Sequence, residues 1–97
     1  LVNLLHLIPS PAAETLLAEV ALVLSPNGTF CLYGPFLRDG QATSPGDAAF
    51  DASLRAQDPT IGYKDLGWVL GHLKGHGLKV RVVEMPANNL MLVARKA

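Results

Sequence analysis

Two short segments of this chain combine polar or aromatic side chains with tight turns. The first is Tyr33-Gly34-Pro35-Phe36, which follows a short apolar run. Because glycine and proline side by side end a strand abruptly, Tyr33 and Phe36 should flank the carboxyl end of that strand. In open α/β sheets, ligands bind at that end. The second segment, Met85-Pro86-Ala87-Asn88-Asn89, is expected to form a specific loop on the same fold.

Charged side chains add further candidates for binding. Arg38 and Arg55 could anchor a substrate carboxylate or phosphate. Arg55 also has a structural alternative, which we favour, because Asp51 lies one helical turn earlier and such a pair is worth about 0.3 kcal/mol. His72 and His76 share a helix face, but the sequence places no third ligand near them, so no metal site is predicted.

The composition limits the classes of function. The 97 residues suffice for one small domain; 49% are hydrophobic and 16% are charged, with a mean hydropathy of +0.28. This is apolar for a freestanding domain, so part of the surface is expected to meet more protein. The net charge is zero and there is no basic run, which argues against binding of nucleic acid through phosphates.

Cys31 is the one cysteine, so no internal disulfide can form and a reducing, cytoplasmic location is expected. Its place in an apolar run favours a buried structural thiol over a reactive one. No apolar stretch reaches the roughly 20 residues that a membrane-spanning helix needs.

Hydrophobic periodicity and turn signals predict seven elements. The first is a strand over residues 1–8, covered on both faces because its hydrophobicity is continuous. Ser10 is expected to cap the helix that follows. The remaining elements are a helix over residues 10–24, a strand over 29–33, helices over 47–57 and 63–76, and strands over 78–85 and 90–95.

The predicted fold class is α/β with the order β-α-β-α-α-β-β. A strand, a helix and a strand in succession predict a parallel pair, and the last two strands predict an antiparallel hairpin. This arrangement is typical of the C-terminal half of a Rossmann-like class I methyltransferase sheet, so residues 1–97 are expected to be one partial domain. The glycine- and proline-rich loop over residues 34–46 is expected to be a mobile lid.

Five separated segments have the same order and spacing as in a known family. They are Asn3 with His6 and Pro9, Tyr33-Gly34-Pro35-Phe36, Phe50-Asp51 with Ser53-Leu54-Arg55, Asp58-Pro59 with Gly62, and Met85-Pro86-Ala87-Asn88-Asn89. On these segments the whole chain resembles the methyltransferase-like protein 26 family of S-adenosylmethionine (SAM)-dependent methyltransferase-like proteins. Ser10, Asp47 and Ile61 depart from its usual pattern.

The resemblance implies SAM as the cofactor and a chain that is the C-terminal half of a longer protein. Family members are about twice this length, and the N-terminal half carries the main cofactor motifs, so these 97 residues alone are expected to be inactive. The resemblance places His6, Leu7 and Pro9 near the reacting methyl group, with Leu7 and Pro9 against SAM. His6 could accept a proton, since an ordinary imidazole is mostly neutral at pH 7. The alternative is a core histidine satisfied by backbone groups.

The resemblance also implies a substrate-binding rim, composed of Tyr33, Gly34, Pro35, Phe36, Arg38, Asn88 and Asn89. Tyr33 and Phe36 could form an aromatic wall that contacts a sulfonium by a cation–π interaction, or could pack in the core. Asn88 and Asn89 could line the rim, or could serve as turn residues.

The sequence therefore predicts the C-terminal part of a class I SAM-dependent methyltransferase with an unknown, small-molecule methyl acceptor and no membrane or nucleic-acid partner. The alternative is a non-catalytic α/β interaction module that docks on another chain through the open edge of the strand over residues 1–8. Such an edge could also cause self-association.

Overall fold

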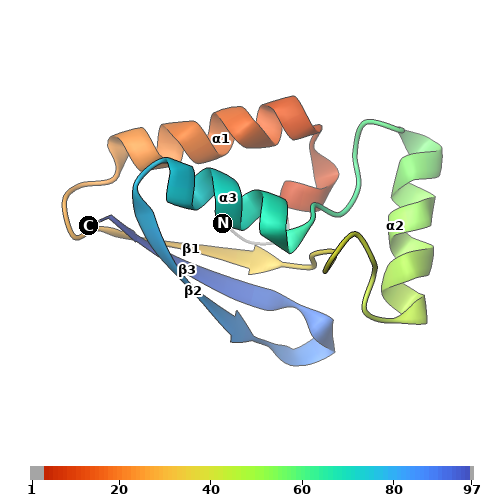
Figure 1. The fold of residues 1–97 in the computed structure, drawn as a ribbon. Helices are drawn as coiled ribbons and strands as arrows, with labels where there is room; N and C mark the ends of the chain where they lie inside the picture. The colour runs from red at the N-terminus through yellow and green to blue at the C-terminus, as the bar shows by residue number, and fades with distance from the viewer. Residues whose placement is uncertain (1–3, 97) are drawn as a thin grey trace.

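The computed structural model describes residues 4–96 as a three-stranded sheet with helices (Figure 1). In chain order the elements are the 3-10 helix η1 (Leu5–Leu7), α1 (Ser10–Val23), β1 (Thr29–Gly34), α2 (Pro45–Gln57), α3 (Leu66–Gly75), β2 (Leu78–Glu84), the 3-10 helix η2 (Pro86–Asn88) and β3 (Leu90–Lys96).

β3 lies in the middle of the sheet, whose strand order is β1-β3-β2. Both pairings are antiparallel, so Leu92 of β3 stands opposite Leu32 on one side and Val82 on the other. The predicted C-terminal hairpin of β2 and β3 is confirmed. The predicted parallel pair is wrong, because the return strand of the hairpin inserts between the two strands that run in the same direction. The α/β class and its C-terminal hairpin remain.

The strand predicted over residues 1–8 is also wrong where the structure describes it. Residues 5–7 form η1 instead, and the N–H of Leu7 donates to the carbonyl oxygen of Leu4 at 2.8 Å. Residues 1–3, including Asn3, lie outside the described part of the chain. Ile8 and Pro9 connect η1 to α1, so the described residues before α1 form a turn rather than a strand.

α1 and α3 lie over one face of the sheet (Figure 1). Side chains on that face are buried, among them Leu90, Leu92 and Ala94 of β3. Because neighbouring residues of a strand point to opposite faces, Cys31 and Val93 lie on the other side. Within residues 4–96 no helix covers that side, and Cys31 is exposed rather than buried as predicted.

Side chains fix two of the helix starts. The Ser44 hydroxyl caps α2 by accepting from the N–H of Asp47 at 3.1 Å. A carboxylate oxygen of Asp65 caps α3 by accepting from the N–H of Gly67 at 3.0 Å. Such caps satisfy amides that have no partner within the helix. The predicted cap at Ser10 is not formed, because Pro9 holds the cap position and Ser10 is the first helical residue.

The helices are short, and α1 is the longest with 14 residues. In the described chain, none is long and apolar enough to cross a membrane.

The central position of Leu92 gives a test of this packing. Leu92 is fully buried on β3, so Leu92→Ala should lower the free energy of unfolding by about 2–5 kcal/mol. Leu22→Ala is the matched control, since that leucine is 80% exposed on α1 and its truncation should change stability by less than about 0.5 kcal/mol. Denaturant unfolding of both variants provides the comparison. Equal losses of stability would contradict the described core.

Candidate active site

The ring of His6 contacts the rings of Phe50 and Tyr63. We call these three residues the aromatic slot. The centroid of the His6 ring is 5.6 Å from that of Tyr63 and 5.9 Å from that of Phe50, each in edge contact. The rings of Phe50 and Tyr63 are 6.1 Å apart, also edge to face. Only 6% of His6 is exposed, so the slot holds the imidazole in one place and away from bulk water.

The ring nitrogens of His6 are not used by the protein around them. Within residues 4–96 neither nitrogen makes a hydrogen bond. A buried polar group normally has a partner, and a histidine of purely structural role would be held by backbone groups. The role of His6 as a proton acceptor stays a prediction.

The surroundings of His6 keep its imidazole neutral. Burial lowers the pKa of His6 below its usual value of 6.5, and the positive charge of Lys64 lowers it further. A neutral imidazole has a free lone pair and can accept a proton at pH 7.

Lys64 is the second buried polar residue, with 7% of its surface exposed. Its Nζ donates to the carbonyl oxygens of Ile8 at 2.7 Å and Gly62 at 2.9 Å. The N–H of Gly62 in turn donates to the carbonyl oxygen of His6 at 3.0 Å. Burial lowers the pKa of Lys64, as does the nearby charge of Arg55, while Asp51 raises it. Lys64 therefore ties the turn that carries His6 to the segment before α3.

Two carboxylates of α2 hold Tyr63 in the slot. The hydroxyl of Tyr63 donates to Asp47 at 3.0 Å, and its backbone N–H donates to Asp51 at 2.8 Å. Burial raises the pKa of Tyr63, and the bond to Asp47 raises it further, so this phenol stays neutral.

The predicted ion pair between Arg55 and Asp51 is confirmed, with Nε 3.1 Å from the carboxylate. Arg55 also donates to the carbonyl oxygen of Tyr63 at 3.1 Å, so its guanidinium supports the slot. Gly62 passes close to this pair with a φ of 136°, and a Cβ there would lie 2.8 Å from atoms of both side chains. Only glycine fits that position without a shift of the ion pair.

A second group of predicted residues meets at the carboxyl end of β1. The hydroxyl of Tyr33 accepts a hydrogen bond from the Asn89 amide at 3.2 Å, and Arg38 donates to the carbonyl oxygen of Asn88 at 3.3 Å. These four are among the seven residues that were predicted to form a substrate-binding rim, and from here on "the rim" means these four. A hollow of about 130 Å³ lies beside them and is also lined by Glu84 and Met85.

The hairpin tip gives the rim its shape. Ala87 and Asn88 have φ values of 60° and 61°, the left-handed conformation that asparagine tolerates better than most residues. The Nε of Arg38 is buried with no partner in the described chain. One terminal nitrogen of the guanidinium thus donates to Asn88, while its Nε has no partner among the described residues.

The other predicted residues lie around these two groups. Gly34 ends β1 and is buried, Pro35 follows it half-buried, and Phe36 packs in the core with 3% exposed. Leu7 is 45% exposed in η1, and Pro9 precedes α1.

Leu7 and Leu4, 45% and 38% exposed, leave an apolar edge on the turn that carries His6. His72 pairs with Glu14 at 3.6 Å, and residues 4–96 hold no cluster of three potential metal ligands.

Sequence reasoning missed Asp47, Tyr63 and Lys64 as site residues. The match at Asp58-Pro59 and Gly62 lies next to Tyr63 and Lys64 in the sequence but did not identify these side chains. Lys64 gave no local signal, because one of its partners, Ile8, lies 56 residues away.

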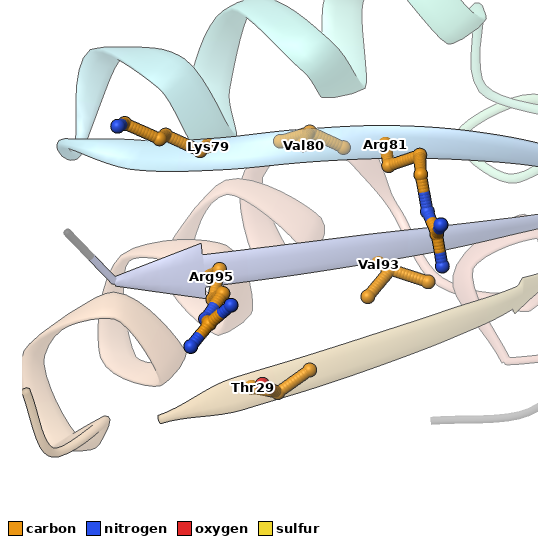
Figure 2. Close-up of a pocket in the computed structure, with 6 residues that line it drawn as sticks. All are labelled: Thr29, Lys79, Val80, Arg81, Val93 and Arg95. Atoms are coloured by element: carbon orange, nitrogen blue, oxygen red, sulfur yellow. The ribbon is translucent and has the colours of Figure 1, made fainter. Parts of the chain in front are cut away.

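A separate hollow of about 450 Å³ lies on the uncovered face of the sheet (Figure 2). It is lined by Thr29, Lys79, Val80, Arg81, Val93 and Arg95. Thr29 begins β1 whereas Tyr33 is near its end, so this hollow lies toward the opposite end of the sheet from the rim.

The chain belongs to the family described as "Protein of unknown function (DUF938)", whose family model matches residues 1–96. Several solved structures with the same fold are described as methyltransferases. An O-methyltransferase family protein from Burkholderia thailandensis is 18% identical with a TM-score of 0.86, and the match covers 100% of this chain and 29% of that one.

Two further structures agree. An O-methyltransferase family 2 protein from Planctomyces limnophilus, solved in complex with apigenin, is 21% identical with a TM-score of 0.85 over 100% of this chain and 30% of that one. Human N-acetylserotonin methyltransferase, solved with SAM, is 16% identical with a TM-score of 0.80 over 99% and 28%. The chain thus has the fold of the corresponding part of these methyltransferases and spans under a third of their length.

The lowered pKa of His6 predicts a dependence of stability on pH. Its folded pKa lies below the usual 6.5, so its stabilising contribution is present above 6.5 and is lost as the pH falls through the folded pKa. His6→Asn should remove this part of the acid destabilisation, whereas His76→Asn, at an exposed position, should leave it unchanged. Free energies of unfolding measured between about pH 5 and 8 test this. The same pH slope in wild type and His6→Asn would contradict it.

Proposed function

We propose that this chain is the C-terminal part of a class I SAM-dependent methyltransferase domain that acts on a small-molecule acceptor. The observation that carries the proposal is the buried imidazole of His6, neutral and without a hydrogen bond among the described residues. The fold shared with methyltransferases supports it, as do the five segments that resemble the methyltransferase-like protein 26 family.

In this proposal SAM supplies a methyl group that is activated by its sulfonium. His6 accepts the proton from the attacking group of the acceptor, and the aromatic slot excludes water from that transfer. Tyr33, Arg38 and the hairpin-tip asparagines orient the acceptor, while Leu7 and Pro9 contact the cofactor. The remainder of the domain provides the polar groups that bind SAM, so the 97 residues alone are inactive.

The acceptor in this proposal is a small molecule. Two of the similar structures are a complex with apigenin and a methyltransferase named for N-acetylserotonin. The hollow at the rim, about 130 Å³, suits part of a small molecule, and the unpaired Nε of Arg38 marks a guanidinium with spare hydrogen-bonding capacity.

A second candidate function is a non-catalytic interaction module that docks on another chain. The observation that favours it is the sheet face opposite α1 and α3, together with the outer edge of β1, which pairs with no strand among residues 4–96. Unpaired edges recruit other chains, including second copies.

Replacement of His6 separates these functions. In the protein that contains this chain, His6→Asn should lower turnover roughly 10²-fold while SAM affinity is nearly unchanged, because the imidazole acts on the proton and not on the cofactor. Turnover is measured as S-adenosylhomocysteine formed from SAM with a protein-free extract of cellular small molecules, and affinity by calorimetry.

Tyr33→Phe is the matched control, since it keeps the ring and removes only the hydroxyl that bonds Asn89. A large loss of turnover in His6→Asn but not in Tyr33→Phe would place the proton transfer on His6. Normal turnover in His6→Asn would remove His6 from the chemistry. A wild-type protein that binds no SAM would favour the interaction module.

A further inference from the structure

Three segments that are far apart in the sequence meet at Lys64. Its Nζ donates to the carbonyl oxygen of Ile8, just after η1, and to that of Gly62. Its own carbonyl oxygen accepts from the N–H of Leu37, just after β1, at 2.9 Å. One residue therefore links the turn that carries His6 to the carboxyl end of β1.

This link continues to the rim. Leu66 donates its N–H to the carbonyl oxygen of Leu37 at 2.8 Å, which fixes that residue from both sides. The next residue, Arg38, bonds to the hairpin tip at Asn88. A displacement of Lys64 would thus move the aromatic slot relative to the rim.

The positive charge of Lys64 also lowers the pKa of His6, after the larger effect of burial. The charged groups that face the slot are Asp47, Asp51 and Arg55 of α2, behind Tyr63. The carboxylate of Asp47 accepts from the phenol of Tyr63, and that of Asp51 is paired with Arg55. Neither carboxylate hydrogen-bonds to the imidazole.

We propose that Lys64 is the positioning residue of His6: its ammonium group fixes the His6 turn against the segment that leads to the end of β1, and its positive charge disfavours the protonated form of the imidazole. This inference rests on the proposed function only in that the proposed function gives His6 the role of accepting a proton from the methyl acceptor. The alternative is that Lys64 joins backbone segments and has no influence on the imidazole.

A titration of the His6 imidazole by NMR distinguishes these two roles in the wild-type protein, Lys64→Gln and Lys64→Arg. Gln keeps hydrogen-bond donors and removes the charge, whereas Arg keeps both. The pKa of His6 should lie below 6.5 in the wild type and in Lys64→Arg and should rise in Lys64→Gln.

Melting temperatures of the same variants test whether Lys64 has a purely structural role. If Lys64 only joined backbone segments, Lys64→Gln would melt earlier while the pKa of His6 stayed at its wild-type value. That result would overturn the proposal. If Lys64→Gln does not fold, the wild type still decides, because a His6 that titrates at or above 6.5 contradicts the proposal by itself.

The proposed function is tested separately in the same proteins. Lys64→Gln should lower turnover roughly 10²-fold, as expected when a reacting group is misplaced, and Lys64→Arg should restore part of it. Unchanged turnover in His6→Asn together with a raised His6 pKa in Lys64→Gln would refute the methyl-transfer role of His6 and leave the positioning role intact.

Discussion

The ammonium group of Lys64 has to be buried without losing its hydrogen bonds, and the site is built around that requirement. A buried charge is costly unless polar atoms replace its hydration shell. Here the carbonyl oxygens of Ile8 and Gly62 serve as those atoms, so the turn after η1 and the segment before α3 must lie on either side of one side chain. The same contacts bring His6 into its aromatic slot. The position of the slot is thus a consequence of satisfying one cation.

The sheet places this site at one end of the molecule. Because β3 pairs with both neighbours, β1 and β2 run in the same direction and end at the same side, next to η2 and α2 (Figure 1). The hydrogen bonds of Tyr33 and Arg38 with the hairpin tip join these ends. The aromatic slot with His6 and the rim therefore lie along one edge, the edge where open α/β sheets bind ligands.

The sequence predicted what depends on local pattern. The helices over residues 10–24, 47–57 and 63–76, the hairpin and the ion pair of Arg55 with Asp51 follow from periodicity, turn residues and helical spacing. Prediction from the sequence failed where contacts between distant segments determine the structure. Neither the insertion of β3 beside β1 nor the exposed face around Cys31 has a local signal.

The same distinction between local and long-range features applies to the candidate site. The grouping of Tyr33, Arg38, Asn88 and Asn89 could be predicted because each lies near or just after the carboxyl end of a strand, and the structure brings them together. The support of His6 could not, because Lys64 reaches backbone atoms 56 residues away, a contact that only the folded chain defines.

A structure of the protein that contains this chain, with bound S-adenosylhomocysteine, tests the central claim most directly. The account predicts that the sulfur of the ligand faces the carboxyl end of β1, with the His6 imidazole close to the position that the transferred methyl group would occupy. It also predicts that Lys64 still donates to the carbonyl oxygens of Ile8 and Gly62 in that complex. A sulfur bound away from His6, or an imidazole separated from the ligand by intact protein, would contradict it.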